Sequence, residues 1–196
     1  MSERLNQIWL VSHSYVCVLL DLYRENGFWF TGNKSWDLMK WNALGSIMIS
    51  EKAIEEFLNR PEIHKGSKAI NYGGGPNARC FVAEHVYPSK ILKTLILEKY
   101  SKKNPSFEDF KAIFKKYNRL CYVWHSEDST LRELGLQSKL PDDCAIDDLS
   151  ARYKKAKINS IETKFSDGAS LFKQMEKLRE NGKKKTEVVQ YVSNFS

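Results

Sequence analysis

Apolar residues recur at helical spacing along the first part of the chain. Between residues 3 and 25 they fall close to every third or fourth position, and Glu25-Asn26-Gly27 follows as a stop signal. Ser50 is placed to cap a helix over residues 51–59 that ends before Pro61, and residues 35–49 continue the helical pattern. We therefore expect the first sixty residues to be helical, apart from a short aromatic strand or turn at 27–33.

The pattern changes in the centre of the chain. Two runs that favour β-structure, 68–72 and 80–86, flank a glycine-rich turn, and residues 119–125 are typical of a further strand. Amphipathic helices are expected at 89–100, 107–117 and 126–136, and two more after residue 166, split at Gly182. The predicted helix caps are Ser89, Ser106 with Asp109, and Ser126 or Asp128.

These elements predict an α+β fold, mainly helical with a small central antiparallel sheet. We expect a single domain over 1–196, with an N-terminal helical part (1–66), a central α/β part carrying the candidate site (67–165) and C-terminal helices (166–196).

Composition narrows the class of protein. The four cysteines are scattered, without a C-x-x-C pair, as is typical of reduced thiols. The longest apolar run, Tyr15–Leu20, is too short to cross a bilayer, and the start of the chain does not resemble a signal peptide. The sequence therefore predicts a cytoplasmic protein without a membrane partner.

Charge favours a polyanionic partner. The net charge is +7, and the stretch 99–119 has seven basic residues against two acidic ones, interleaved with aromatic residues. Residues 152–164 are also basic, whereas 126–150 are acidic. We expect binding to nucleic acid, DNA in preference to RNA, and the protein could bind as a homodimer. The residues expected to contact it are Lys111, Lys115, Lys116, Arg119, Arg152, Lys154 and Lys155. The alternative is a set of solvated helix faces.

Glu84 and His85 stand together at the end of a predicted buried strand. Neighbouring side chains of a strand point to opposite faces, so both cannot face the core unless the strand ends or bulges there. An imidazole can accept a proton from water near neutral pH, and a carboxylate beside it can help to hold a divalent cation. This combination suits hydrolysis of a phosphodiester.

The stretch Glu84-His85-Val86-Tyr87-Pro88 resembles the opening of the HNH, or His-Me finger, endonucleases. The resemblance implies a catalytic pair in which His85 is the general base and Glu84 binds or supports a metal ion (Mg, Mn or Zn). In that family a loop, a second strand and a helix with an Asn or a second His follow, whereas here a helical pattern follows Pro88 almost at once. His125 and Glu127, at the end of the next predicted strand, are the candidates to complete the metal site. The sequence around them also resembles uncharacterised bacterial proteins associated with restriction-like nucleases.

Other interpretations remain open. Asp142, Glu162 and Lys164 resemble the PD-(D/E)xK nucleases, in which two carboxylates hold magnesium and the lysine activates water. A non-catalytic basic module, binding nucleic acid or a protein partner, with Trp29, Trp36 and Trp41 as a candidate contact surface, would explain the charge equally well. Glu127 also has a purely structural explanation, because the third position of a helix is where a glutamate satisfies backbone N–H groups.

Overall fold

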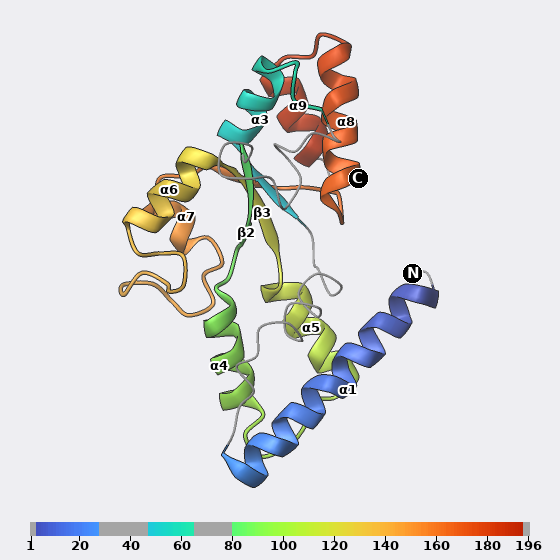
Figure 1. The fold of residues 1–196 in the computed structure, drawn as a ribbon, viewed down its shortest axis with the longest axis vertical. Helices are drawn as coiled ribbons and strands as arrows, with labels where there is room; N and C mark the ends of the chain where they lie inside the picture. Colours follow the sequence, from blue (N-terminus) through green and yellow to red (C-terminus); the bar gives the residue numbers. More distant parts are fainter. Residues whose placement is uncertain (1–2, 28–46, 65–79, 194–196) are drawn as a thin grey trace. The chain divides into compact units, whose positions relative to one another are not determined.

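The computed structural model describes residues 3–27, 47–64 and 80–193. Its helices are α1 (Glu3–Asn26), α3 (Glu51–Asn59), α4 (Ser89–Lys99), α5 (Phe107–Tyr117), α6 (His125–Glu133), α7 (Ala151–Lys155), α8 (Gly168–Glu180) and α9 (Lys185–Ser193), and its strands are β1 (Met48–Ser50), β2 (Phe81–His85), β3 (Leu120–Trp124) and β4 (Ser160–Glu162) (Figure 1). The predicted strand or turn at 27–33, the run 68–72, its glycine-rich turn and the candidate tryptophan surface lie outside the described residues, except for Gly27.

The chain divides into two compact units. The first unit comprises residues 1–45 and 89–118, and the second comprises 46–88 and 119–196. Helices α4 and α5, which lie between β2 and β3 in sequence, therefore belong to the first unit, whereas both strands belong to the second. The single domain predicted from the sequence stays a prediction.

Helices α1, α4 and α5 belong to the first unit. Trp9 of α1 packs edge-on against Phe110 of α5, with ring centroids 5.9 Å apart. The Nε2 atom of His13 lies 2.9 Å from the carbonyl oxygen of Pro105, within hydrogen-bond distance. Ser106 caps α5 as predicted, because its hydroxyl oxygen accepts from the backbone N–H of Asp109 at 3.1 Å.

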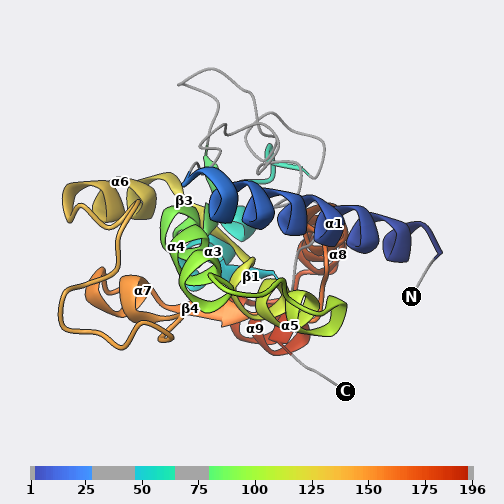
Figure 2. The ribbon, with the colours of Figure 1, turned by 90° about the horizontal axis from the view of Figure 1, so that it is seen from below.

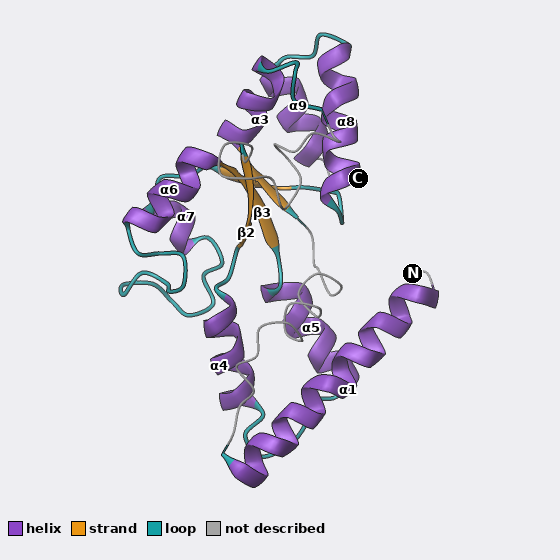
Figure 3. Cartoon of the chain, viewed as in Figure 1, coloured by secondary structure: helices purple, strands orange, loops and turns teal. Residues whose placement is uncertain are grey.

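The second unit is built on a four-stranded sheet with the order β2-β3-β1-β4. The α+β class is confirmed, but the antiparallel sheet is a wrong detail: β1 runs parallel to β3, while the two outer pairs are antiparallel. A parallel pair needs a long crossover connection, and the chain from Glu51 to Arg119 supplies it. Figure 3 shows the strands as the centre of this unit, with helices around them.

Helices cover the two faces of the sheet differently. Cys121 and Val123 of β3 pack with Leu131 of α6 and Tyr153 of α7. On the other face an aromatic cluster joins Phe57 of α3, Phe81 of β2 and Phe172 of α8, and its ring centroids lie 5.1 to 6.2 Å apart. Figures 1 and 2 show α6 and α7 on one side of the sheet and α8 and α9 on the other.

Within 3–27 and 47–60, the part of the first sixty residues that the structure describes, the prediction of helix is wrong at Met48–Ser50. Met48–Ser50 is a strand, because its apolar residues pair with β3 and β4 in the middle of the sheet, and this pairing outweighs a local helical pattern. The helix predicted after Ser50 is confirmed over Glu51–Asn59, with Ser50 as its cap. The stop after α1 and the break between α8 and α9 are also confirmed at Gly27 and Gly182, whose φ angles of 64° and 67° suit glycine.

Candidate functional site

Glu84 lies at the end of β2 and is paired with a buried arginine. The Arg152 side chain, from α7, is 0% exposed, and its Nη2 donates to Oε2 of Glu84 at 3.0 Å. Its Nη1 donates to the backbone carbonyl oxygen of His85 at 2.5 Å. One guanidinium group therefore holds the side chain of Glu84 and the backbone of His85 together.

Asp128 of α6 is the second carboxyl group at this end of the strand. It is buried, and it lies near enough to Glu84 to act on the pKa of the Glu84 carboxyl group. Burial raises the pKa of the Glu84 carboxyl group, the neighbouring Asp128 raises it further, and Arg152 opposes both. Asp128 also accepts from Nη2 of Arg132 at 3.0 Å and from Nε2 of Gln137 at 3.4 Å. The two acids form a carboxyl pair that can share a proton or a cation.

His85 is beside this pair in sequence but faces the other way. In the β2–β3 ladder Glu84 lies opposite Cys121, on the face covered by α6 and α7, and His85 lies opposite Leu120. The His85 side chain is half-buried. Because β2 ends at His85, the imidazole and the Glu84 carboxyl group leave the sheet at the same point but from opposite faces.

His125 and Glu127 belong to the first turn of α6, which follows β3 directly. His125 comes five residues after Leu120, the partner of His85, which corresponds to about 17 Å along the strand. The structure therefore does not bring His125 and Glu127 together with Glu84 and His85 as one metal site. The sequence interpretation groups residues that follow two strands, but two antiparallel strands end at opposite ends of their ladder.

Glu127 has a structural role at the start of α6. Its Oε2 accepts from the backbone N–H of Trp124 at 2.8 Å and from the Ser50 hydroxyl group at 2.5 Å. Burial raises the pKa of the Glu127 carboxyl group, and these two hydrogen bonds oppose the shift. Trp124 is the N-cap of α6, not Ser126 or Asp128 as the sequence suggests, because the helix already begins at His125.

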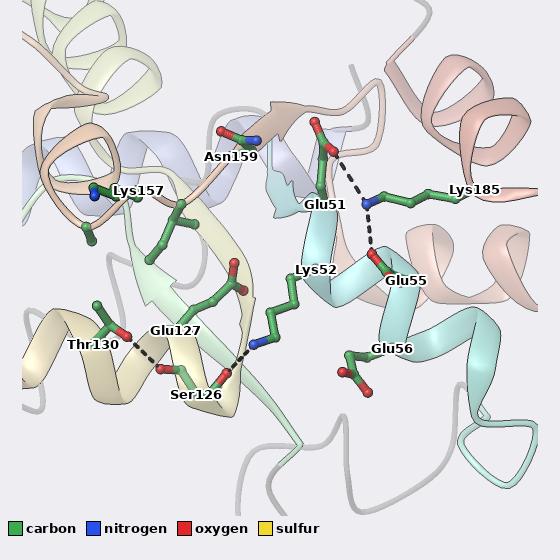
Figure 4. A pocket seen from close by; sticks show the side chains of 12 residues that line it. Glu51, Lys52, Glu55, Glu56, Ser126, Glu127, Thr130, Lys157, Asn159 and Lys185 are labelled. Atoms are coloured by element: carbon green, nitrogen blue, oxygen red, sulfur yellow. Dashed lines mark hydrogen bonds and ion pairs between the residues drawn. The ribbon is translucent and has the colours of Figure 1, made fainter.

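A cavity of about 560 Å³ lies beside Glu127, at the carboxyl ends of the parallel strands β1 and β3 (Figure 4). Three of its seven charged residues pair with one another: Nζ of Lys185 lies 3.5 Å from Glu51 and 2.9 Å from Glu55. Lys52 donates to the Ser126 hydroxyl oxygen at 2.8 Å. Figure 4 shows these contacts in the lining of the cavity, which includes neither Glu84 nor His85.

Most of the basic residues expected to contact nucleic acid are paired with acids. Arg119 pairs with Glu162, Arg152 with Glu84, Lys111 with Glu108, Lys154 with Asp148 and Lys155 with Asp143. Arg152 is moreover buried, so it does not present its charge at the surface. Lys115 and Lys116 are exposed on the last turn of α5. The basic character of 152–164 is thus reduced locally by the acidic stretch before it.

The residues of the PD-(D/E)xK interpretation have different neighbours. Asp142 lines a cavity with Leu134 and Lys155, whereas Glu162 is on β4 and pairs with Arg119. Nζ of Lys164 lies 3.8 Å from the centroid of the Tyr191 ring on α9. We find no arrangement in the described residues that draws these three side chains around one point.

Asp128 is a candidate site residue that the sequence pattern does not single out, since it fits there only as a helix cap one position after Glu127. The sequence does contain an indication that Asp128 faces the sheet. It lies three residues before the apolar Leu131 and one turn before Arg132, so it shares a helix face with Leu131. The buried contact with Glu84 depends on tertiary packing, which the sequence pattern does not contain.

Comparisons with known proteins add no relative: no protein family, no curated protein and no solved structure matches this chain. Two further observations concern only the described residues. None of their helices has the length and apolar character that crossing a membrane requires. They also contain no group of three or more His, Cys, Asp or Glu side chains that could hold a metal ion, so the carboxyl pair of Glu84 and Asp128 stands by itself.

Proposed function

We propose that this protein is a metal-dependent nuclease that hydrolyses phosphodiester bonds of DNA, with its site at the end of β2. His85 is the general base, and Glu84 and Asp128 are the ligands of a divalent cation. The proposal keeps the HNH resemblance of the sequence and replaces His125 and Glu127 by Asp128.

The observation that carries the proposal is the order of elements around Glu84 and His85. In the HNH family a strand ending in the catalytic histidine is followed by a second strand and a helix. Here β3 lies antiparallel to β2, and α6 follows β3 directly and packs against both strands. The helices that interrupt the pattern in the sequence, α4 and α5, belong to the other unit. Asp128 of α6 faces Glu84, where a ligand from the helix is expected.

The residues present suit a magnesium or manganese ion. Both ligands are carboxylates, which are the donors that these hard cations prefer. Magnesium is commonly held by one or two protein carboxylates together with waters and substrate phosphates, so a pair without a third protein ligand is sufficient. Asp128 is buried, and the Glu84 carboxyl group beside it is largely shielded from solvent, so a cation bound there would offset the burial of negative charge.

The chemistry assigns a separate task to each group. His85 takes a proton from a water molecule, whose oxygen then attacks phosphorus. The bond from phosphorus to the leaving oxygen breaks, and a second water protonates that oxygen. A cation between Glu84 and Asp128 would neutralise charge on the phosphate and on the leaving oxygen. Exposed lysines such as Lys115 and Lys116 supply sequence-independent contacts to phosphates. We expect this activity in the cytoplasm, because the scattered cysteines are typical of reduced thiols.

Cleavage of plasmid DNA and of a mixed RNA pool tests the proposal. Wild type, His85→Ala, Asp128→Asn and His125→Ala are compared with Mg²⁺, Mn²⁺ or EDTA, and His64→Ala, an exposed histidine outside every proposed site, is the matched control. We expect metal-dependent cleavage of DNA that is lost in His85→Ala and Asp128→Asn and retained in His125→Ala and His64→Ala.

Other outcomes are equally informative. Loss of activity in His125→Ala with full activity in His85→Ala would contradict the site at the end of β2. Activity that survives both changes and falls in Glu162→Gln or Lys164→Ala would favour the PD-(D/E)xK interpretation. Salt-sensitive DNA binding without cleavage under any metal would identify a non-catalytic module.

A further inference from the structure

We infer that Arg152 is a positioning residue, which fixes the Glu84 side chain and the His85 backbone in the geometry that hydrolysis requires. This inference rests on the proposed function for its catalytic consequence. Its structural part, that Arg152 restrains His85, can be tested separately.

The contacts of Arg152 differ from those of an ordinary ion pair. Nη2 donates to Oε2 of Glu84 at 3.0 Å, and Nη1 donates to the carbonyl oxygen of His85 at 2.5 Å. The two donors belong to one rigid planar group, so they fix the direction of the Glu84 carboxylate relative to the backbone of the next residue. This is the place where β2 ends, and the next backbone N–H, that of Val86, donates to the carbonyl oxygen of Arg119 at 2.9 Å.

Arg152 lies on α7, and the loop before this helix is fixed by several hydrogen bonds. Asp148 accepts from the Ser150 backbone N–H at 2.9 Å and from Lys154 at 3.0 Å, on either side of Arg152. The Tyr87 hydroxyl group, two residues after His85, donates to the carbonyl oxygen of Ile146 at 2.8 Å. The loop and the end of β2 are therefore joined twice, by Tyr87 and by Arg152.

The hydrogen bonds of the Arg152 guanidinium group indicate which contacts determine its orientation. The Nε of Arg152 is buried and has no hydrogen-bond partner among the described residues. A buried arginine whose only task was to neutralise Glu84 could turn to satisfy Nε as well. Its orientation serves the two contacts to Glu84 and His85 and leaves Nε unsatisfied. This pattern is expected of a group that holds reactive residues in place.

The test uses the full chain and the conservative variant Arg152→Lys. A lysine keeps the charge, but its ammonium group cannot reproduce the two fixed donors of the guanidinium plane. The matched control is Arg179→Lys: Nη1 of Arg179 also bridges two backbone carbonyl oxygens, those of Phe57 and Arg60, both at 2.8 Å, and it contacts neither Glu84 nor His85. Circular dichroism and thermal unfolding establish that each variant is folded at the assay temperature.

Two measurements are then made on the folded proteins. The amide and ring order parameters of His85 are obtained by NMR relaxation, and kcat and KM are measured for DNA cleavage. In Arg152→Lys we expect the amide order parameter to fall from about 0.85 to below about 0.6. We expect kcat to fall by about 10- to 100-fold with little change in KM. Arg179→Lys should change neither quantity.

The outcomes separate this inference from the proposed function. An unchanged His85 order parameter in folded Arg152→Lys contradicts the inference, whether or not wild type cleaves DNA. A lowered order parameter without loss of kcat also contradicts it, because Arg152 would then only stabilise the fold. If wild type cleaves nothing, the proposed function fails, and the order parameter still decides whether Arg152 restrains His85. If Arg152→Lys does not fold, Glu84→Gln, which keeps an acceptor for Nη2, is measured in its place, with unchanged His85 order and a selective loss of metal-dependent kcat expected.

Discussion

Glu127 and Glu84 both have a raised pKa, yet their surroundings differ. Glu127, in the first turn of α6, accepts from the Trp124 backbone N–H and the Ser50 hydroxyl group. Glu84, near the end of β2, meets a buried arginine and a second carboxyl group, that of Asp128, and His85 is its neighbour in sequence. Burial is the largest cause of both shifts, so burial alone does not distinguish the two carboxyl groups.

The partners distinguish the two carboxyl groups. Those of Glu127 are groups that any helix start must satisfy, and its role is complete once they are bonded. Glu84 and Asp128 also have partners, Arg152 for the first and Arg132 with Gln137 for the second, but the two acids lie near each other and their like charges are unfavourable. A cation beside them would relieve this repulsion, which makes the pair the better candidate for function.

The largest expected effect is on the histidines. His85→Ala should lower kcat for DNA cleavage by about 100- to 10,000-fold, the usual contribution of a general base. His125→Ala should leave it within about twofold. Single-turnover cleavage rates measure both. Equal losses in the two variants would contradict the assignment of His85 alone as the general base.

Metal affinity should follow the carboxyl pair. Asp128→Asn is expected to weaken Mn²⁺ binding by about 10- to 100-fold, because an amide oxygen carries no negative charge. Glu127→Gln should bind Mn²⁺ as wild type does. Isothermal titration calorimetry compares the two variants, and weaker binding only in Glu127→Gln would reverse the roles assigned to the two acids.

Stability should respond in the opposite way. Glu127→Ala leaves the Ser50 hydroxyl group and the Trp124 N–H without an acceptor, and it should reduce the free energy of unfolding by about 1 to 3 kcal/mol. Asp128→Asn should cost less, since it removes a repulsion from Glu84 together with its own bonds. Urea denaturation of both variants gives the values. A larger loss in Asp128→Asn would make that acid the structural one.

The smallest expected effect is on thermal stability at acidic pH. The bonds from Ser150 and Lys154 hold the pKa of Asp148 down at about 2, compared with 3.8 as its ordinary value. A lowered carboxyl pKa gives stability that is present above the ordinary value and lost as the pH falls toward 2. Wild type should therefore lose more of its thermal stability than Asp148→Asn when the pH falls through this window. Parallel melting curves at several acidic pH values check it, and equal losses would show that this loop does not depend on Asp148.

Much of the fold could be predicted because its elements carry local signals. Ser50, Ser106 and Gly182 mark helix boundaries where the structure has them. Met48–Ser50 could not be assigned correctly, since its strand exists only through pairing with β3 and β4. The parallel pairing and the place of α4 and α5 in the first unit are likewise properties of contacts between distant segments, which a local pattern does not contain.

The candidate site could be predicted in part. Glu84 and His85 stand out in the sequence because their residue types and strand-end position carry a chemical meaning by themselves. Asp128 and the role of Arg152 could not be predicted, because each depends on a contact with Glu84 made across the fold. His125 and Glu127 resemble Glu84 and His85 in position along a strand, but the antiparallel register places them at the far end.

The most direct measurement is paramagnetic broadening of histidine ring signals by Mn²⁺. The imidazole resonances of His85 and His125 are assigned by substitution and followed as Mn²⁺ is added to wild type and to Asp128→Asn. A cation held by Glu84 and Asp128 should broaden the His85 signals, and Asp128→Asn should abolish this broadening. Broadening of His85 that persists in Asp128→Asn, or no broadening at concentrations that support cleavage, would contradict the site at the end of β2.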